Sequence, residues 1–189
     1  MPDQQTPPTE PPRRGKVRQP SLLLVNTGDG KGKSTAAFGT AMRAIARGWQ
    51  VAVIQFLKSG EWSVGEEKLG GEIGIHWWAL GDGFTWDSED MDESEAIARR
   101  AWNEAAERIK SGLYELVILD EVTYPINWGW VELSQVLTVL RDRPTKVNVI
   151  ITGRDAPEEL IELADTVTEM RKVKHAYDKG VMARRGIDY

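Results

Sequence analysis

The sequence predicts an α/β fold in three layers, with a mostly parallel central sheet and helices on both of its faces. Short apolar runs, suited to strands buried on both faces, alternate along the chain with longer segments of helical pattern. The 189 residues are 41% hydrophobic and 28% charged. These values are ordinary for one globular domain with a substantial core.

The predicted strands and helices follow one another in a regular order. Strands are expected at residues 21–26, 50–57, 73–80, 114–119, 147–152 and 166–170. Helices are expected from Ser34 to about Gly48, from Met91 or Asp92 to about Lys110, at residues 130–141 and from Pro157 to Leu163. Residues 58–71, which are polar and glycine-rich, predict a loop with one helical turn, and residues 171–189 a basic, irregular tail.

Composition limits the classes of protein to consider. Residues 1–20 hold six prolines and few apolar side chains, so they predict a disordered or extended arm before a single domain at residues 21–189. A net charge of −5 gives no electrostatic argument for a nucleic-acid partner. The absence of cysteine excludes disulfides, thiolate metal sites and cysteine nucleophiles. No apolar run is long enough to span a membrane, so we expect no membrane partner and a cytoplasmic location.

A glycine-rich motif lies between the first predicted strand and the first predicted helix. It consists of Thr27, Gly28, Asp29, Gly30, Lys31, Gly32, Lys33, Ser34 and Thr35. Glycine backbones can direct several N–H groups at one anion, and a following helix adds its positive N-terminus. Lys33 would reach the outer phosphates, and the Ser34 hydroxyl would reach Mg²⁺. The motif predicts a nucleoside triphosphate site in a P-loop NTPase-like fold, although Thr27 replaces the first glycine of the usual pattern G-x-x-x-x-G-K-[ST].

A second motif, LYELVILDE at residues 113–121, ends in Asp120 and Glu121. An apolar strand followed by an acid resembles the Walker B strand, whose carboxylate holds Mg²⁺ directly or through water. Adjacent residues point in different directions, so only one of the two carboxylates can face the metal squarely. A helix cap or a solvated sheet edge is the alternative interpretation.

Three further side chains are candidates for contacts with a ligand. Arg154 follows the fifth predicted strand and could clamp phosphates, or it could pair with Asp155 or Glu158. Phe84 and Trp86, in the glycine-flanked loop GFTW, could form a flat ligand platform or pack into the local core. No N-K-x-D motif is present, which argues against a guanine-specific switch.

Several segments together resemble the P-loop type of ATP:corrinoid adenosyltransferase. They are TGDGKGKSTAAFGTAMRA, QFLK, GFTW, LVILDEVTY, VIITGR, ELADTVTEM and the tail VKHAYDKGVMARRGIDY, which cover essentially residues 21–189. The resemblance implies a homodimer that transfers the 5′-deoxyadenosyl group of ATP to the Co(I) of cobalamin, cobinamide or cobyrinic acid a,c-diamide, and that releases triphosphate. A reduced flavin or flavoprotein is the implied electron donor, and Mg²⁺ (or Mn²⁺) the implied metal.

The resemblance also implies roles for single residues. The backbone from Gly28 to Lys33 and the Lys33 side chain would hold the triphosphate. Ser34 and Glu121 would bind Mg²⁺, with Asp120 in support. The other implied positions are Arg43 and Arg154 near the nucleotide, and Phe84 and Trp86 against the lower face of the corrin, where they would displace its axial base.

One position departs from the family pattern. Asp29 stands where many relatives have Asn. A carboxylate beside phosphates is unfavourable unless it pairs with Lys31 or faces away.

Two other functions remain as alternatives. A P-loop kinase or ATPase would transfer or hydrolyse the γ-phosphoryl group and release ADP, and GFTW argues against it. A non-catalytic nucleotide-responsive protein would bind ATP without turnover, and the retained Lys33, Ser34 and Glu121 argue against that.

Overall fold

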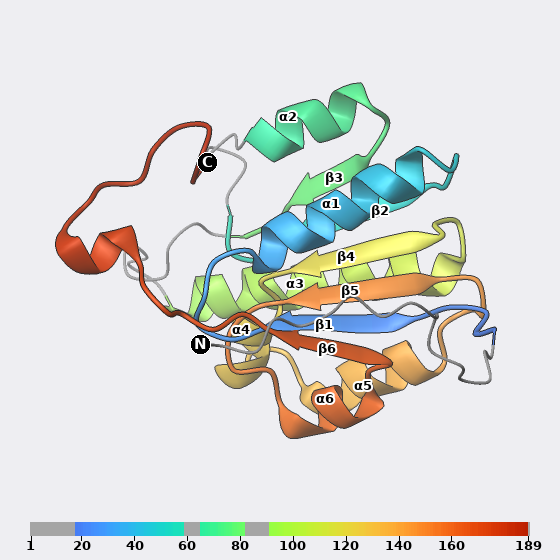
Figure 1. Cartoon of the computed structure of the whole chain (residues 1–189). Coiled ribbons are helices and arrows are strands. Elements are labelled where there is room, and N and C mark those ends of the chain that lie inside the picture. The colour runs from blue at the N-terminus through green and yellow to red at the C-terminus, as the bar shows by residue number, and fades with distance from the viewer. Residues whose placement is uncertain (1–17, 59–64, 82–90, 189) are drawn as a thin grey trace, which may run out of the picture.

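The computed structural model describes residues 18–58, 65–81 and 91–188. Six strands form one sheet in the order β3-β2-β4-β5-β1-β6, and every neighbouring pair is parallel. Their bounds are β1 Leu23–Thr27, β2 Val51–Gln55, β3 His76–Ala79, β4 Leu116–Asp120, β5 Asn148–Thr152 and β6 Thr166–Glu169. Each strand overlaps a predicted one, so the α/β fold class is confirmed (Figure 1).

Helices cover both faces of the sheet (Figure 1). On one face, α1 (Lys33–Ile45) packs its small apolar residues against alternate side chains of the strands, such as Val51 and Val53. On the other face, α3 (Met91–Ser111), α5 (Leu133–Arg141) and α6 (Glu158–Leu163) cover the intervening side chains. The central strands are therefore buried on both sides, as their continuous apolar sequences predict.

Two short helices differ from the sequence prediction. The predicted loop at residues 58–71 is wrong in part, because α2 (Gly65–Glu72) is a helix of eight residues. Two glutamates in its first turn suit the positive helix N-terminus, and Gly70 lets α2 approach the Trp77 ring, since a Cβ there would lie 3.0 Å from that ring. α4 (Thr123–Asn127) was not predicted.

The predicted helix at residues 130–141 begins later, at Leu133 in α5. The backbone N–H groups of Trp130 and Val131 instead donate to the carbonyl oxygen of Pro125, within α4. This turn occupies the residues that the sequence pattern had assigned to the first helical turn.

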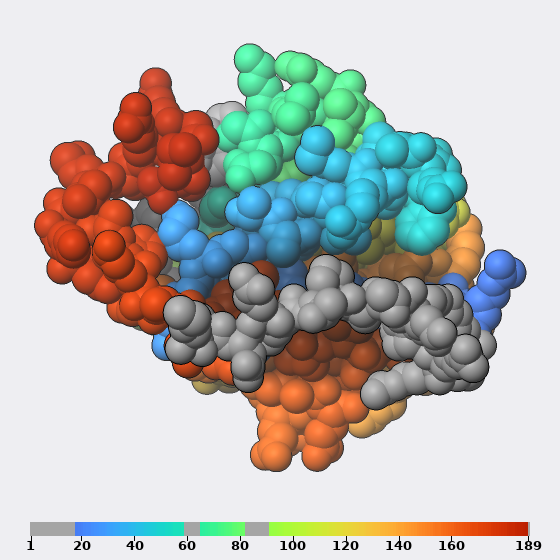
Figure 2. All heavy atoms as spheres, in the orientation of Figure 1, coloured from blue at the N-terminus to red at the C-terminus, as the bar shows by residue number. Residues whose placement is uncertain are grey.

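The C-terminal segment, residues 170–188, leaves the sheet after β6 and runs beside the carboxyl ends of the strands. It contains a short 3₁₀ helix, η2 (Ala176–Lys179). Figure 2 shows this segment, in red, projecting from the body of the molecule. Among the described residues, no helix is long and apolar enough to cross a membrane. Of the predicted arm at residues 1–20, all but the last three residues lie outside the described part of the chain.

Candidate functional site

The glycine loop, residues 28–32, connects β1 to α1 at the carboxyl edge of the sheet. Gly28 and Gly32 have φ values of 91° and 110°, a region that other residues rarely adopt. A Cβ at Gly28 or Gly30 would lie 2.7 Å from the Met170 carbonyl oxygen. The loop therefore needs glycine for its backbone conformation and for its close contact with the chain after β6.

Lys33 is the first residue of α1, and its side chain turns back onto the glycine loop. Its Nζ donates to the carbonyl oxygens of Gly28 and Gly30 at 2.7 and 2.8 Å. Burial, and secondarily the charge of Arg154, lowers the Lys33 pKa. Ser34 and Thr35 follow in the first turn of α1. An ammonium group and a hydroxyl thus lie together where the helix begins.

Asp120, the last residue of β4, is fully buried and held by two neighbouring strands. Its Oδ1 accepts a hydrogen bond from Thr152 Oγ1 at 2.7 Å, and its Oδ2 accepts one from Gln55 Nε2 at 2.9 Å. Gln55 Oε1 in turn accepts from Trp77 Nε1 at 2.9 Å. This chain of hydrogen bonds fixes the orientation of the Asp120 carboxylate.

Glu121 follows directly and has an unusual backbone conformation. Its φ of 65° is left-handed, which costs a residue other than glycine about 1–2 kcal/mol. Its N–H donates to Thr152 Oγ1 at 3.0 Å. Burial, followed by repulsion from Asp120, raises the Glu121 pKa to about 7, while Lys58, Lys33 and Arg154 act in the opposite direction. Two carboxyl groups and three cations therefore lie together at one end of the sheet.

Arg154, after β5, contacts the glycine loop rather than its own neighbours in sequence. Its Nε lies 4.0 Å from Asp29 Oδ1, and both side chains are more than half exposed, so this ion pair is weak. Asp29 thus pairs with Arg154, whereas Lys31 pairs with Asp188 of the C-terminal segment. Of the interpretations that the sequence left open for Arg154, the structure favours a place beside the glycine loop.

Two further contacts fix the loops around the site. Thr27 Oγ1, at the end of β1, accepts a hydrogen bond from the Ala156 N–H at 3.2 Å. Thr123 Oγ1 donates to the Arg154 carbonyl oxygen at 2.7 Å, and a Cβ on Gly153 would lie only 1.9 Å from that hydroxyl. Gly153 therefore lets the chain that carries Arg154 pass close to α4.

One predicted site residue, Arg43, is not brought to the glycine loop, and two others fall outside the described part of the chain. Arg43 lies in the last turn of α1, and its guanidinium donates to Thr40 Oγ1 at 3.0 Å. Ten helical residues, about 15 Å of rise, separate it from Lys33. Phe84 and Trp86 lie outside the described residues.

No local sequence motif identifies the residues that orient Asp120. Gln55 and Thr152 are the last residues of β2 and β5, the strands on either side of β4. A polar residue that ends an otherwise apolar strand was the available signal. This signal identifies the two residues only when the strand order is known, because the order β2-β4-β5 places both side chains beside Asp120.

A parallel sheet with a glycine loop, a lysine at a helix N-terminus and acidic residues at a strand end is typical of nucleotide-binding α/β proteins. The family model described as ATP:corrinoid adenosyltransferase BtuR/CobO/CobP matches residues 19–189. The chain belongs to this family, and its activity is transfer of the adenosyl group of ATP to a corrinoid.

Curated relatives agree with this family. The chain is 44% identical over 168 residues to "Corrinoid adenosyltransferase" of Escherichia coli K12, covering 89% of this chain and 85% of the relative. It is 42% identical to "Corrinoid adenosyltransferase CobA" of Salmonella typhimurium, with the same shares of the two chains covered. It is also 42% identical to "Corrinoid adenosyltransferase" of Pseudomonas aeruginosa, covering 89% of this chain and 83% of that one.

Among solved structures, domain III of the replication initiation protein DnaA of Thermotoga maritima is similar over 78% of this chain and 53% of that one. The TM-score is 0.42 and the identity 12%, too low for any argument about function.

Proposed function

We propose that the glycine loop and Lys33 hold the triphosphate of ATP, and that C5′ of the ribose faces the corrinoid cobalt. The observation that carries this proposal is the position of Lys33 Nζ, 2.7 and 2.8 Å from two carbonyl oxygens of the loop. An ammonium group bound only to neutral carbonyls can exchange them for phosphate oxygens, which form stronger, charge-assisted hydrogen bonds.

The reaction needs electrostatic stabilisation more than it needs a base. The electron pair of Co(I) forms the Co–C5′ bond, and the C5′–O bond breaks, so that triphosphate leaves with the bonding electrons. Cobalt ends as Co(III), and no proton is transferred. Lys33, the start of α1 and Arg154 would oppose the negative charge that develops on the leaving group. Holding both substrates in one site, with cobalt close to C5′, supplies the remaining lowering of the activation barrier.

A divalent cation, Mg²⁺ or Mn²⁺, suits the acidic end of β4. Asp120 is fully buried, and its neighbour Glu121 has a pKa raised by burial and by that carboxylate, so a cation would relieve their repulsion. No group of three or more acidic or histidine side chains suitable for a metal occurs among the described residues. This fits Mg²⁺, which commonly takes one or two carboxylates together with phosphate oxygens and water. We assign the protein ligands to Ser34 and Glu121, with Asp120 in support.

The remaining roles rest on the family resemblance. Phe84 and Trp86 would exclude water and the axial base from the lower face of the corrin, leaving a cobalt that is easier to reduce. A reduced flavin or flavoprotein would supply the electron, in a cytoplasmic homodimer. We leave Arg43 out of the phosphate contacts of its own chain, because it lies at the far end of α1.

The test is an anaerobic incubation with Mg-ATP and chemically reduced cob(I)alamin. We expect loss of the Co(I) absorbance, formation of a light-sensitive alkylcobalamin and release of intact triphosphate. A Lys33→Ala variant serves as the matched blank. Persistence of the Co(I) band, with ADP formed from ATP, would instead indicate a kinase or ATPase. Binding of ATP without any product would indicate a nucleotide-responsive binding protein.

A further inference from the structure

A pocket lies between the glycine loop and the C-terminal segment. Its volume is about 390 Å³, and its wall comes from Gly30 and Lys31 on one side and from residues 171–176, 187 and 188 on the other. Lys33, Ser34, Glu121 and Arg154 do not line it. The Gly30 N–H donates to the Met170 carbonyl oxygen, so this amide serves the contact with the C-terminal segment. The pocket therefore lies beside the site around Lys33 and shares Gly30 and Lys31 of the glycine loop with it.

The charge of this region is opposite to that of the whole chain. The protein carries a net charge of −5, yet residues 171–188 contain six lysines and arginines against two aspartates. Four basic side chains line the pocket: Lys31, Arg171, Lys172 and Lys174. Such a local concentration of positive charge attracts anions even when the protein as a whole repels them.

The chain already places one oxyanion against the pocket wall. The Asp188 carboxylate pairs with Lys31 and also accepts a hydrogen bond from the Arg184 N–H at 2.8 Å. The Lys31 hydrogen bond lowers the Asp188 pKa. Lys172 pairs with Asp178 at 3.2 Å, whereas Arg171 and Lys174 have no ion pair within the described residues. Two basic side chains of the pocket are thus available to a further anion.

We propose that this pocket binds a phosphate group of a substrate or product of the transfer reaction. The proposal rests on the proposed function, which supplies two sources of phosphate. One is the released triphosphate, and the other is the phosphodiester group of cobalamin. Arg171 and Lys174 would contact the phosphate, and Asp188 would compete with it for Lys31. The position beside Gly30 places this second phosphate site next to the loop that the triphosphate leaves.

The first experiment titrates inorganic triphosphate into protein that already carries one equivalent of Mg-ATP, without corrinoid, by calorimetry. The wild-type protein should bind about one further equivalent. The variant Arg171→Ala/Lys174→Ala should weaken this binding about tenfold, because two charge-assisted hydrogen bonds are lost. The matched variant Lys179→Ala/Arg185→Ala removes the same charge from the same segment outside the pocket, and should change binding less than about twofold. Asp188→Asn should tighten it by about threefold, since Lys31 is freed.

The second experiment separates the two sources. If the corrinoid phosphodiester occupies the pocket, Arg171→Ala/Lys174→Ala raises KM for cobalamin and not for cobinamide, which lacks that group. If released triphosphate occupies it, both KM values stay unchanged and inhibition by added triphosphate weakens.

The proposal is overturned if the two double variants lose triphosphate binding equally, or if Arg171→Ala/Lys174→Ala changes neither the KM for cobalamin nor the inhibition by added triphosphate. Failure of the proposed function is distinguishable, because the Co(I) band would then persist in the anaerobic incubation with Mg-ATP, whatever the pocket binds.

Discussion

The two edges of the sheet contain the same kinds of polar side chain but use them differently. At the amino edge, where the parallel strands begin, carboxylate, amide and basic side chains bind one another. They also bind backbone N–H and carbonyl groups beside the first residues of the strands. At the carboxyl edge, where the strands end, two carboxylates are adjacent. The basic groups there bind neutral carbonyl oxygens, as Lys33 does, or form a weak ion pair, as Arg154 does. The first arrangement is complete without a ligand, whereas the second gains from one.

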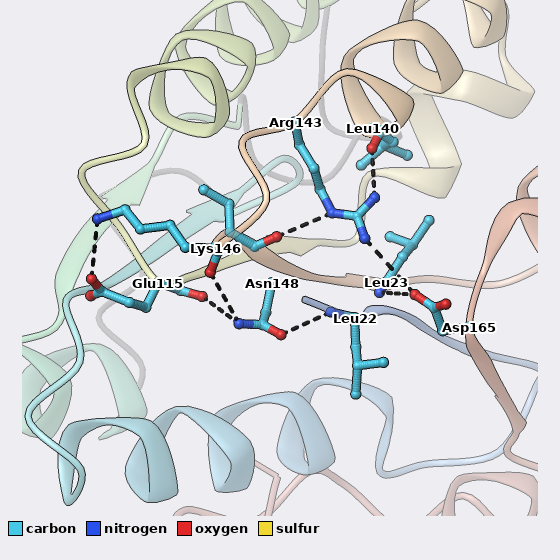
Figure 3. Close-up of polar contacts among 9 residues, drawn as sticks. Leu22, Leu23, Glu115, Leu140, Arg143, Lys146, Asn148 and Asp165 are labelled. Carbon is cyan, nitrogen blue, oxygen red and sulfur yellow. Dashed lines mark hydrogen bonds and ion pairs between the residues drawn. The ribbon is translucent and has the colours of Figure 1, made fainter. Parts of the chain in front are cut away.

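Figure 3 shows the amino edge. The Asn148 side chain accepts a hydrogen bond from the Leu22 N–H at 2.9 Å and donates to the Glu115 carbonyl oxygen at 2.8 Å, so it joins the chain before β1 to β4 and β5. Asp165 accepts from the Leu23 N–H at 2.7 Å, and Arg143 lies 3.8 Å from that carboxylate. Charge and backbone are satisfied here by the chain itself.

The carboxyl edge keeps strain and unfavourable charge. Glu121 is partly buried, in a left-handed conformation, beside the fully buried Asp120. Lys33, one of the cations whose charge acts on Glu121, donates to loop carbonyls. Such costs persist at functional sites, where the rest of the fold holds the groups in place for a ligand. We therefore expect mutations at the carboxyl edge to lower activity, and mutations at the amino edge to lower stability.

The largest expected effect is on activity, from Lys33→Ala. Loss of the ammonium group removes charge stabilisation of the leaving triphosphate, and we expect kcat/KM to fall by about 10²–10³-fold. Steady-state assays with Mg-ATP and cob(I)alamin measure this. Lys146→Ala is the matched control, because it removes a lysine of the amino edge whose partner, Glu115, lies at 3.3 Å. Equal losses in both variants would show that the edges do not differ in this way.

Glu121→Gln should change the pH dependence of stability. The folded-state pKa of Glu121, about 7, lies above the ordinary value of 4.5. The folded protein therefore binds more protons between these values, and the free energy of unfolding falls as pH rises through this window. In metal-free protein at pH 8, Glu121→Gln should be more stable than wild type by about 1–3 kcal/mol, and the two should converge near pH 4. Urea unfolding with EDTA at several pH values measures this.

Glu115, the control at the amino edge, has a pKa shifted in the opposite direction to that of Glu121. The Gln50 N–H lowers the Glu115 pKa, with Lys146 in support. The stability that Glu115 contributes is therefore present above its unfolded-state pKa and is lost as pH falls through the folded-state value. Glu115→Gln should make the protein slightly less stable at neutral pH, and a stabilising effect there would contradict the comparison.

Asn148→Ala should affect stability and leave catalysis unchanged. The substitution removes the side-chain partner of the Leu22 N–H and of the Glu115 carbonyl oxygen, and we expect a loss of about 0.5–1.5 kcal/mol because the first of these hydrogen bonds is exposed. Urea unfolding measures the loss, and kcat per folded molecule should remain that of the wild type. A fall in kcat per folded molecule would show that the amino edge is coupled to the site.

The sequence predicts the local parts of the site well, because each is a continuous motif. The strand, glycine loop and helix around Lys33 are consecutive, and so are β4 and its acidic end. Non-local partners are a different matter. Gln55 is the register partner of Asp120 only because β2 and β4 are neighbours, an order that no local pattern contains. The helix α2 likewise depends on a non-local contact, the packing of Gly70 against Trp77. Helix propensity alone disfavours a helix in this glycine-rich segment.

Asp29→Asn should have the smallest effect, and it tests whether charge at the carboxyl edge is tuned against the ligand. The Asp29 carboxylate is 71% exposed and 4.0 Å from Arg154, so screening keeps its repulsion of phosphate small. We expect the substitution to lower KM for ATP about two- to fivefold with kcat unchanged, since one negative charge near the phosphates is removed and Arg154 is freed. The control is Asp178→Asn, which removes the charge of another exposed aspartate, one that pairs with Lys172, and it should leave KM for ATP unchanged. A higher KM in Asp29→Asn would mean that the carboxylate instead positions Arg154 for binding.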